Sequence, residues 1–252
     1  MNRSIGRYLF GLSAIGFGIG NVVWHDFINA DLLKAYGVPH VEFLAYILGI
    51  VQLIGGVAVL LPKSDRTGAI ALGAVYAFLS LVGFMPVVRH PLVFNGYGNF
   101  FETFSLVSAA AILYAWSGPP TPPRAATAAR YGYYIFGIAV ISFGLEQAFY
   151  FAPTVTLVPK WIPPGQTFWA YATTVAFFLA GIALLTGYLA RLASILNTAM
   201  LLGFGLLVWV PILVADPKNY SNWSEFLETI AIAAASWIVT EYLSAKASPG
   251  TL

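Results

Sequence analysis

Cysteine is absent from this 252-residue chain, and charged residues make up only 9% of it. Without cysteine the protein can form no disulfide, no thiolate metal site and no cysteine-ligated iron–sulfur cluster, and it cannot carry out thiol redox chemistry. A soluble domain carries roughly 25% charged residues, because its surface faces water. The few charges in this chain cannot cover a soluble globule of 27.2 kDa.

Basic tracts are missing as well. The chain has 12 Lys and Arg against 10 Asp and Glu, which gives a net charge of +2. Proteins that bind nucleic acid usually carry a clustered basic patch or a basic tail, and no such cluster is present. Nucleic acid is therefore not an expected partner.

Long apolar runs dominate what is present, with 59% hydrophobic residues and a mean hydropathy of +0.79. A helix needs about 20 mostly apolar residues to cross the hydrocarbon core of a bilayer. Eight runs of this length predict an all-α integral membrane helix bundle of about eight transmembrane helices, with the lipid bilayer as its surroundings. These runs are residues 8–28, 41–61, 68–88, 98–116, 131–152, 167–188, 192–214 and 224–243.

An internal repeat with an offset near 125 residues relates the two halves of the chain. Residues 11–18 align with residues 137–144, and Phe101-Glu102-Thr103 aligns with Leu227-Glu228-Thr229. Because each copy has four helices, the second copy starts on the same side of the membrane, and the two repeats are parallel. The predicted organisation is a first four-helix repeat at 1–116, an extended Pro-rich cytoplasmic linker at 117–130 and a second repeat at 131–246.

The loops predict the orientation of the chain. Eight of the 12 Lys and Arg fall on the side of the N-terminus and four on the opposite side. Basic residues are enriched in cytoplasmic loops, so both termini are expected in the cytoplasm.

Glu146 is the most costly polar residue in this arrangement. It lies about two-thirds of the way along the fifth run, with Gln147 beside it and Tyr150 one turn further. A charge in hydrocarbon costs a few kcal/mol or more, so such a residue faces the bundle interior, a cavity or a partner. Glu146 is therefore either a proton or ligand site, or a structural hydrogen-bonding group between helices.

Three further ionisable residues are candidates on the outer side. Glu102 and Glu228 occupy equivalent positions about one turn into the fourth helix of each copy, where the helix dipole is an alternative, structural explanation. His25 shares a helix face with Asn21 and could act as a base, although a hydrated ring at the interface explains it equally well. All three histidines lie toward the outer rim, which argues against a membrane haem, and no metal site is predicted.

The second half of the chain resembles the DoxX-like membrane family. The resemblance is carried by residues 157–165, Leu-Val-Pro-Lys-Trp-Ile-Pro-Pro-Gly, by Phe168-Trp169-Ala170-Tyr171 and by Asp216-Pro217-Lys218-Asn219. The first half resembles the same unit more weakly. Most members are single four-helix units, so the duplication is a departure, as is Gln147 where members often have histidine.

The resemblance implies a function, because the family is named after a subunit of a thiosulfate–quinone oxidoreductase. It suggests a bacterial inner-membrane protein that serves as a subunit or accessory of a membrane oxidoreductase system, with a membrane redox protein as partner. Quinone or another lipophilic molecule would bind between the two copies on the outer side. The residues expected to line that site are Glu146, Gln147, Tyr150, Glu102 and Glu228, with His25 next.

Two other functions remain open from the sequence. A small-solute transporter would also suit parallel repeats, but it requires polar groups near the midplane and on both sides of the membrane. A non-catalytic scaffold would use its polar residues only to join helices. Whether the chain is itself an enzyme is left open.

Overall fold

The computed structural model describes residues 4–117 and 123–247, and within these ranges every element is a helix. Two short helices, α2 (Ala30–Ala35) and α7 (Phe151–Leu157), connect longer ones. The long helices are α1 (Ile5–Trp24), α3 (Val41–Leu60), α4 (Asp65–Arg89), α5 (Asn95–Trp116), α6 (Pro123–Phe149), α8 (Gln166–Thr186), the consecutive segments α9 (Ala190–Phe204), η1 (Gly205–Trp209) and α10 (Val210–Ala215), and α11 (Tyr220–Ala247).

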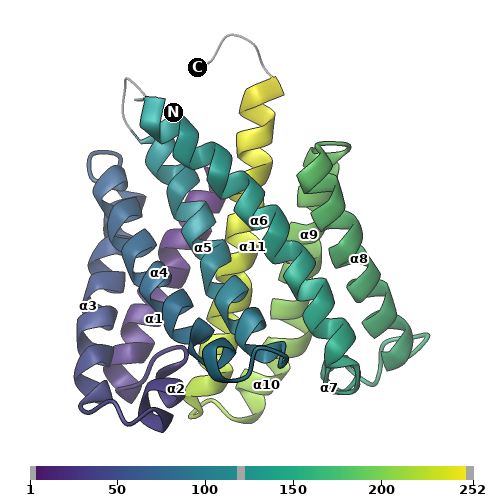
Figure 1. Cartoon of the computed structure of the whole chain (residues 1–252). Coiled ribbons are helices and arrows are strands. Elements are labelled where there is room, and N and C mark those ends of the chain that lie inside the picture. The colour runs from purple at the N-terminus through teal and green to yellow at the C-terminus, as the bar shows by residue number, and fades with distance from the viewer. Residues whose placement is uncertain (1–3, 118–122, 248–252) are drawn as a thin grey trace.

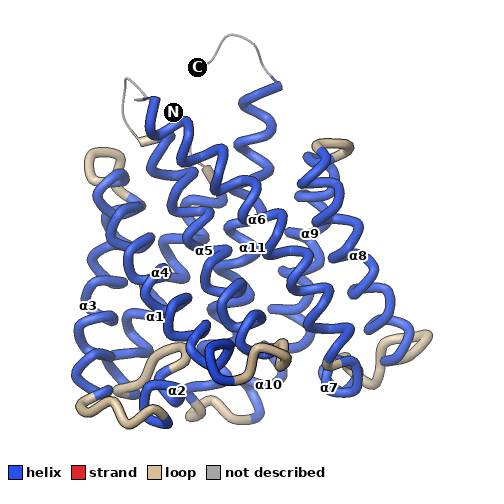
Figure 2. Tube along the Cα trace, in the orientation of Figure 1, coloured by secondary structure: helices blue, strands red, loops and turns tan. Residues whose placement is uncertain are grey.

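The long helices run between two ends, where the loops gather (Figure 2). The start of α1 and the end of α11 lie at the same end of the bundle, which we call the termini end (Figure 1). The short helices α2 and α7 lie at the opposite end, which we call the far end, together with α10. Consecutive long helices therefore alternate in direction.

Each of the eight predicted runs falls on one long helical segment, and the all-helical class is confirmed. Six segments of the described chain are long and apolar enough to cross a membrane: α3, α4, α6, α8, the segment Ala190–Ala215 and α11. The helices α1 and α5 do not reach that hydropathy, because they carry many glycines and polar residues that face the interior, such as Asn21 and Ser105. The fold is that of a multi-pass membrane protein.

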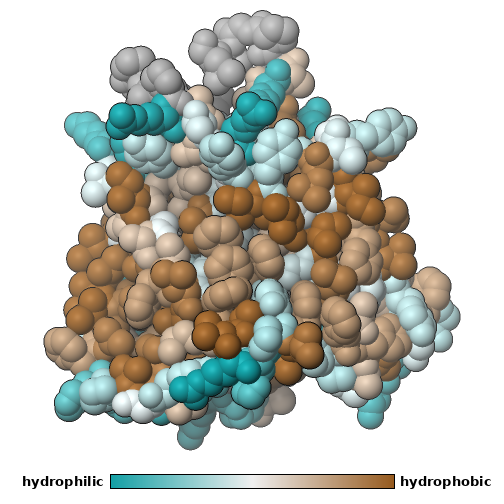
Figure 3. Space-filling model, in the orientation of Figure 1, coloured by the Kyte–Doolittle hydropathy of each residue, from teal (hydrophilic) through white to brown (hydrophobic). Residues whose placement is uncertain are grey.

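The surface agrees with this assignment. On the face shown in Figure 3, apolar residues form a broad belt across the middle of the molecule, and hydrophilic residues collect at its two ends. Large apolar side chains point outward within the belt, among them Leu81 at 66% exposure and Leu179 at 64%. In water such a surface would be costly, whereas in lipid it is the expected exterior.

The bundle has two flanks and a central group. The helices α3 and α4 form one flank, α8 and α9 form the other, and α1, α5, α6 and α11 lie between them (Figure 1). Within the first half α1 packs on α3, α3 on α4 and α4 on α5. Within the second half α6 packs on α8, α8 on α9 and α9 on α11, and the halves meet where α5 contacts α6 and α11 contacts α1 and α5.

Glycine brings α1 and α3 into backbone contact. A Cβ atom on Gly18 would lie 2.7 Å from the carbonyl oxygen of Gly49, and one on Gly56 would lie 2.7 Å from that of Gly11. Membrane helices pack closely through such small residues, because van der Waals contact rather than the hydrophobic effect holds them together in lipid.

The structure corrects the predicted linker. Residues 118–122 lie outside the described residues, and α6 already begins at Pro123, so residues 123–130 are helical and not extended. Proline is well suited to the first position of a helix, where its missing N–H is not needed. The Ala- and Arg-rich residues that follow are strong helix formers, and their helix propensity outweighs the effect of the prolines before them.

The seventh predicted run is not a uniform α-helix. Its middle, η1, is a π-helical segment of five residues that ends shortly before Pro211. Proline has no N–H and its ring crowds the carbonyl four residues earlier, so widening the preceding turn is one way to accommodate it. The seventh run therefore consists of α9, η1 and α10 in succession.

Candidate ligand-binding cavity

A cavity of about 700 Å³ lies in the second half of the bundle, toward the far end. Its walls come from α5 and α6 on one side and from α8, α9, η1 and α11 on the other, and α7 and the loop after it contribute at the far end. Aromatic side chains form much of the lining: Phe143, Tyr150, Trp169, Phe177, Phe204 and Trp209. A cavity of this volume accommodates a molecule of drug or cofactor size.

Three carboxyl groups from three different helices line this cavity: Glu102 on α5, Glu146 on α6 and Glu225 on α11. Among the described residues no Lys, Arg or His lines the cavity. The two ion pairs in the described ranges, Arg7–Asp65 and Lys34–Asp26, involve none of the three glutamates.

Glycine at position 98 makes room for Glu146. A Cβ atom on Gly98 would lie 2.6 Å from the Cδ atom of Glu146, so the carboxyl group of Glu146 rests directly on the backbone of α5. Gly98 and Glu102 are four residues apart and share one face of α5. The same face therefore receives Glu146 and presents Glu102 one turn away.

Gln147 and Tyr150 tie α6 to its neighbours at the cavity wall. The side-chain oxygen of Gln147 accepts hydrogen bonds from the hydroxyls of Thr173 at 3.2 Å and Thr174 at 3.0 Å on α8. The hydroxyl oxygen of Tyr150 accepts a hydrogen bond from the backbone N–H of Asn95 at 3.1 Å. Both predicted site residues line the cavity, and their hydrogen bonds also hold its walls in place.

The other two predicted site residues do not line the cavity. Glu228 is only 7% exposed and lies one turn from Glu225 on α11, turned into the packed interior. His25 ends α1, where its ring packs against Tyr46 of α3 with 5.0 Å between ring centroids. His25 lies outside the cavity because α1 packs on α3 and α11 and contributes no residue to the cavity walls.

Glu225 and Gly203 are two of the lining residues that the sequence interpretation missed. Glu225 precedes Glu228 by three residues, and the repeat pairs it with Asn99, which also lines the cavity. This shared position in the repeat is the sequence feature from which Glu225 could have been predicted. Gly203 on α9 faces open space, since no atom lies within 4 Å of a Cβ built there; nothing in its sequence context indicates this.

Known proteins provide no counterpart from which the role of this cavity could be inferred. No family model, no curated protein and no solved structure matches the chain. The resemblance to the DoxX-like family therefore stays a prediction. The case for a binding site comes from the cavity and its carboxyl groups.

The chemistry available in the cavity is that of recognition. Carboxylates accept hydrogen bonds and attract positive charge, and the aromatic walls offer apolar contact and π faces. Among the described residues, no group of three His, Asp or Glu side chains is arranged to hold a metal ion. The arrangement suits a lipophilic molecule with a polar or charged group, held between α5, α6, α8, α9 and α11.

Proposed function

We propose that this chain is a DoxX-like protein of the bacterial inner membrane, which serves as a subunit or accessory of a membrane oxidoreductase system. In this proposal it binds quinone or another lipophilic molecule in the far-end cavity, and a membrane redox protein is its partner. The observation that carries the proposal is a cavity of about 700 Å³ with mostly apolar and aromatic walls and three carboxyl groups. A lipophilic molecule that dissolves in the bilayer can reach such a site without crossing water.

Eight membrane crossings in two parallel repeats are part of the proposal. With 20 and 22 residues, α1 and α5 are about 30 Å long or slightly more, enough to span the hydrocarbon core. The contacts α1–α3, α3–α4 and α4–α5 have counterparts in α6–α8, α8–α9 and α9–α11. The contact between α5 and α6 likewise corresponds to that between α11 and α1. A two-fold axis through the α5–α11 contact would generate this pattern.

The orientation proposed from the loops puts the termini end in the cytoplasm and the cavity toward the outer leaflet. Arg7, Lys63, Arg66 and Arg191 are near the termini end, where the positive-inside rule favours them. A ligand in the cavity would then be within reach of partners on the outer face.

The transporter alternative has less support from the lining. The residues that close the cavity toward the termini end are apolar: Phe143, Phe177, Met200, Leu201 and Ile232. A small polar solute would need hydrogen-bonding groups along that direction. A scaffold with no ligand would in turn have no use for an unfilled cavity of this size.

Filling the cavity tests the proposal. The Gly203→Phe variant places a ring in space that is empty next to Gly203, and we expect it to lose the lipophilic molecule that the native protein retains on gentle detergent extraction. The readout is untargeted mass spectrometry and quinone absorbance of the extracted lipids, per mole of protein. Leu179→Phe is the matched control, because Leu179 is 64% exposed and faces outward.

The proposal predicts about one bound molecule per native chain and per Leu179→Phe chain, and at least about tenfold less in Gly203→Phe. If the extracts of all three proteins are the same, the cavity is not a binding site for a lipophilic molecule.

A further inference from the structure

We infer that the molecule bound in the far-end cavity is a lipophilic organic cation, such as a hydrophobic amine or phosphonium. This inference rests on the proposed function, because it names the chemical class of the lipophilic ligand. It is carried by three carboxyl groups and six aromatic side chains that converge on one cavity in which the described chain supplies no positive charge.

The carboxyl groups are without partners. No hydrogen bond or ion pair reaches the side-chain oxygens of Glu102, Glu146 or Glu225 from any described residue. Glu102 and Glu146 are partly buried and Glu225 is exposed within the cavity. Carboxyl groups inside a membrane are normally paired, because an unpaired charge in a medium of low dielectric is costly. Like charges from three helices are stabilised together when a positive charge lies between them.

A fourth carboxyl group lies behind the cavity wall. Glu228 is 7% exposed, and its Oε1 atom is buried with no hydrogen-bonding partner among the described residues. Glu228 lies three residues after Glu225 on α11, in the packed interior. An unpaired carboxyl group next to three others does not stabilise the helix packing by itself, but it strengthens the attraction for a cation in the cavity.

The aromatic lining favours a cation over an uncharged polar molecule. Aromatic rings attract organic cations through their π faces, and cages of several rings are used to recognise quaternary ammonium groups. The four cation–π contacts in the described residues are made by Arg7, Arg66, Arg89 and Lys246. None of them uses a ring of the cavity, where Phe177 packs edge-on against Phe143 and Phe204.

Two other ligand classes fit the lining less well. An oxidised quinone is uncharged and has only hydrogen-bond acceptors, so it can bond to a carboxyl group only where that group is protonated. A bare metal ion needs several ligands within coordination distance, and no such group occurs among the described residues. The volume of about 700 Å³ also suits an organic molecule.

The test measures the binding of tetraphenylphosphonium to the protein in nanodiscs of zwitterionic lipid. Triphenylphosphine oxide is the uncharged comparison, because it carries similar rings without a net charge. We expect tetraphenylphosphonium to bind saturably and at least about tenfold more tightly than the oxide, as a charge-assisted contact implies. Glu102→Gln, Glu146→Gln and Glu225→Gln should each weaken its binding by about tenfold or more.

Glu42→Gln is the matched control, since Glu42 is exposed in the first turn of α3, does not line the cavity and should leave the binding unchanged. Equal affinity for the two compounds, with no effect of the three glutamine variants, would overturn the cationic ligand while leaving a lipophilic site in place. If neither compound binds the native protein more tightly than the Gly203→Phe variant, the proposed binding function fails as well.

Discussion

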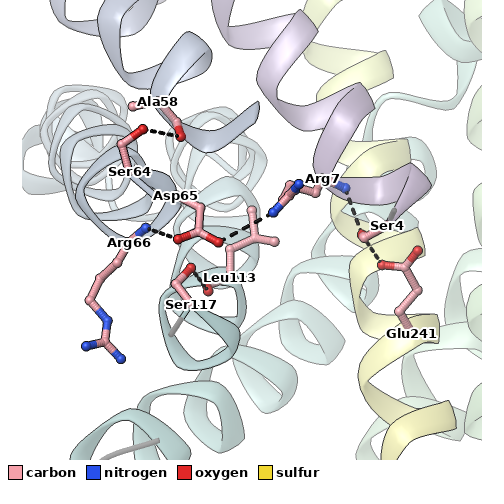
Figure 4. A network of polar contacts seen from close by, with 9 residues as sticks. All are labelled: Ser4, Arg7, Ala58, Ser64, Asp65, Arg66, Leu113, Ser117 and Glu241. Carbon is pink, nitrogen blue, oxygen red and sulfur yellow. Dashed lines mark hydrogen bonds and ion pairs between the residues drawn. The ribbon is translucent and has the colours of Figure 1, made fainter. Parts of the chain in front are cut away.

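Asp65→Asn is expected to lower the free energy of unfolding by about 3–5 kcal/mol, the usual result of removing one partner of a buried ion pair. Asp65 begins α4 and lies 3.4 Å from the guanidinium of Arg7 on α1, and the two side chains are 11% and 10% exposed (Figure 4). The substitution leaves the Arg7 charge buried, where its Nε atom already has no partner among the described residues.

The measurement is unfolding in mixed micelles with increasing denaturant, followed by helical circular dichroism. The double variant Arg7→Met with Asp65→Leu should recover most of the loss, because it removes both charges. Lys34→Met is the matched control at the exposed Lys34–Asp26 pair, where we expect a change of about 1 kcal/mol or less. A loss as small as this for Asp65→Asn would mean that the Arg7–Asp65 pair is hydrated and does not join α1 to α4.

Gly68→Ala is expected to lower the free energy of unfolding by about 3 kcal/mol, at the upper end of the cost of overpacking a tight interface. A Cβ atom on Gly68 would lie 2.5 Å from the backbone nitrogen of Val59 and 2.7 Å from the carbonyl oxygen of Gly55. Both are backbone atoms of α3, so no side chain can rotate away and α4 must separate from α3.

Gly203→Ala is the control for this substitution. Nothing lies within 4 Å of a Cβ atom there, so the higher helix propensity of alanine should leave the stability unchanged or raise it by up to about 1 kcal/mol. The same denaturant titration reports both variants. If the two behave alike, α3 and α4 are not packed through glycine, and the arrangement of the first flank is wrong.

The helices themselves could be predicted from the sequence, because lipid leaves little choice. A backbone surrounded by hydrocarbon must satisfy its own hydrogen bonds, so an apolar run of about 20 residues becomes a helix. The runs at residues 41–61 and 167–188 match α3 and α8 to within two residues at each end. Hydropathy says nothing about helices that lie along an end of the bundle, and α2 and α7 were not predicted for that reason.

The site was predicted only in part. The cost of a charge in lipid identified Glu146, and the repeat identified Glu102, and both line the cavity. The same repeat placed Glu228 in an equivalent position, yet the surroundings of the two differ. On the side of α1 and α3, Asn21 lies 2.8 Å from the Gln52 amide and 2.7 Å from the Tyr220 hydroxyl, and polar side chains fill the interior.

The two halves of the bundle differ in their interior packing because of residues that the hydropathy pattern does not distinguish. Gln52 and Tyr76 are both fully buried in the first half, and the repeat pairs them with Phe177 and Leu201, which line the cavity in the second. How far α8 and α9 separate from α6 and α11 depends on such pairs and on the π-helical turn of η1. A hydropathy pattern predicts which face of each helix is apolar, but it does not predict how far apart neighbouring helices lie.

The central claim, a cavity that molecules in the membrane can enter, is tested most directly by thiol labelling. Because the chain has no cysteine, single cysteines can be placed without background: Gly203→Cys in the cavity, Leu179→Cys on the outer surface and Ala231→Cys in the core, where Ala231 is 0% exposed. With a lipophilic methanethiosulfonate reagent in nanodiscs, we predict that Gly203→Cys is labelled nearly as fast as Leu179→Cys and far faster than Ala231→Cys. Labelling of Gly203→Cys as slow as that of Ala231→Cys would contradict the account, because the helices would then close over the site.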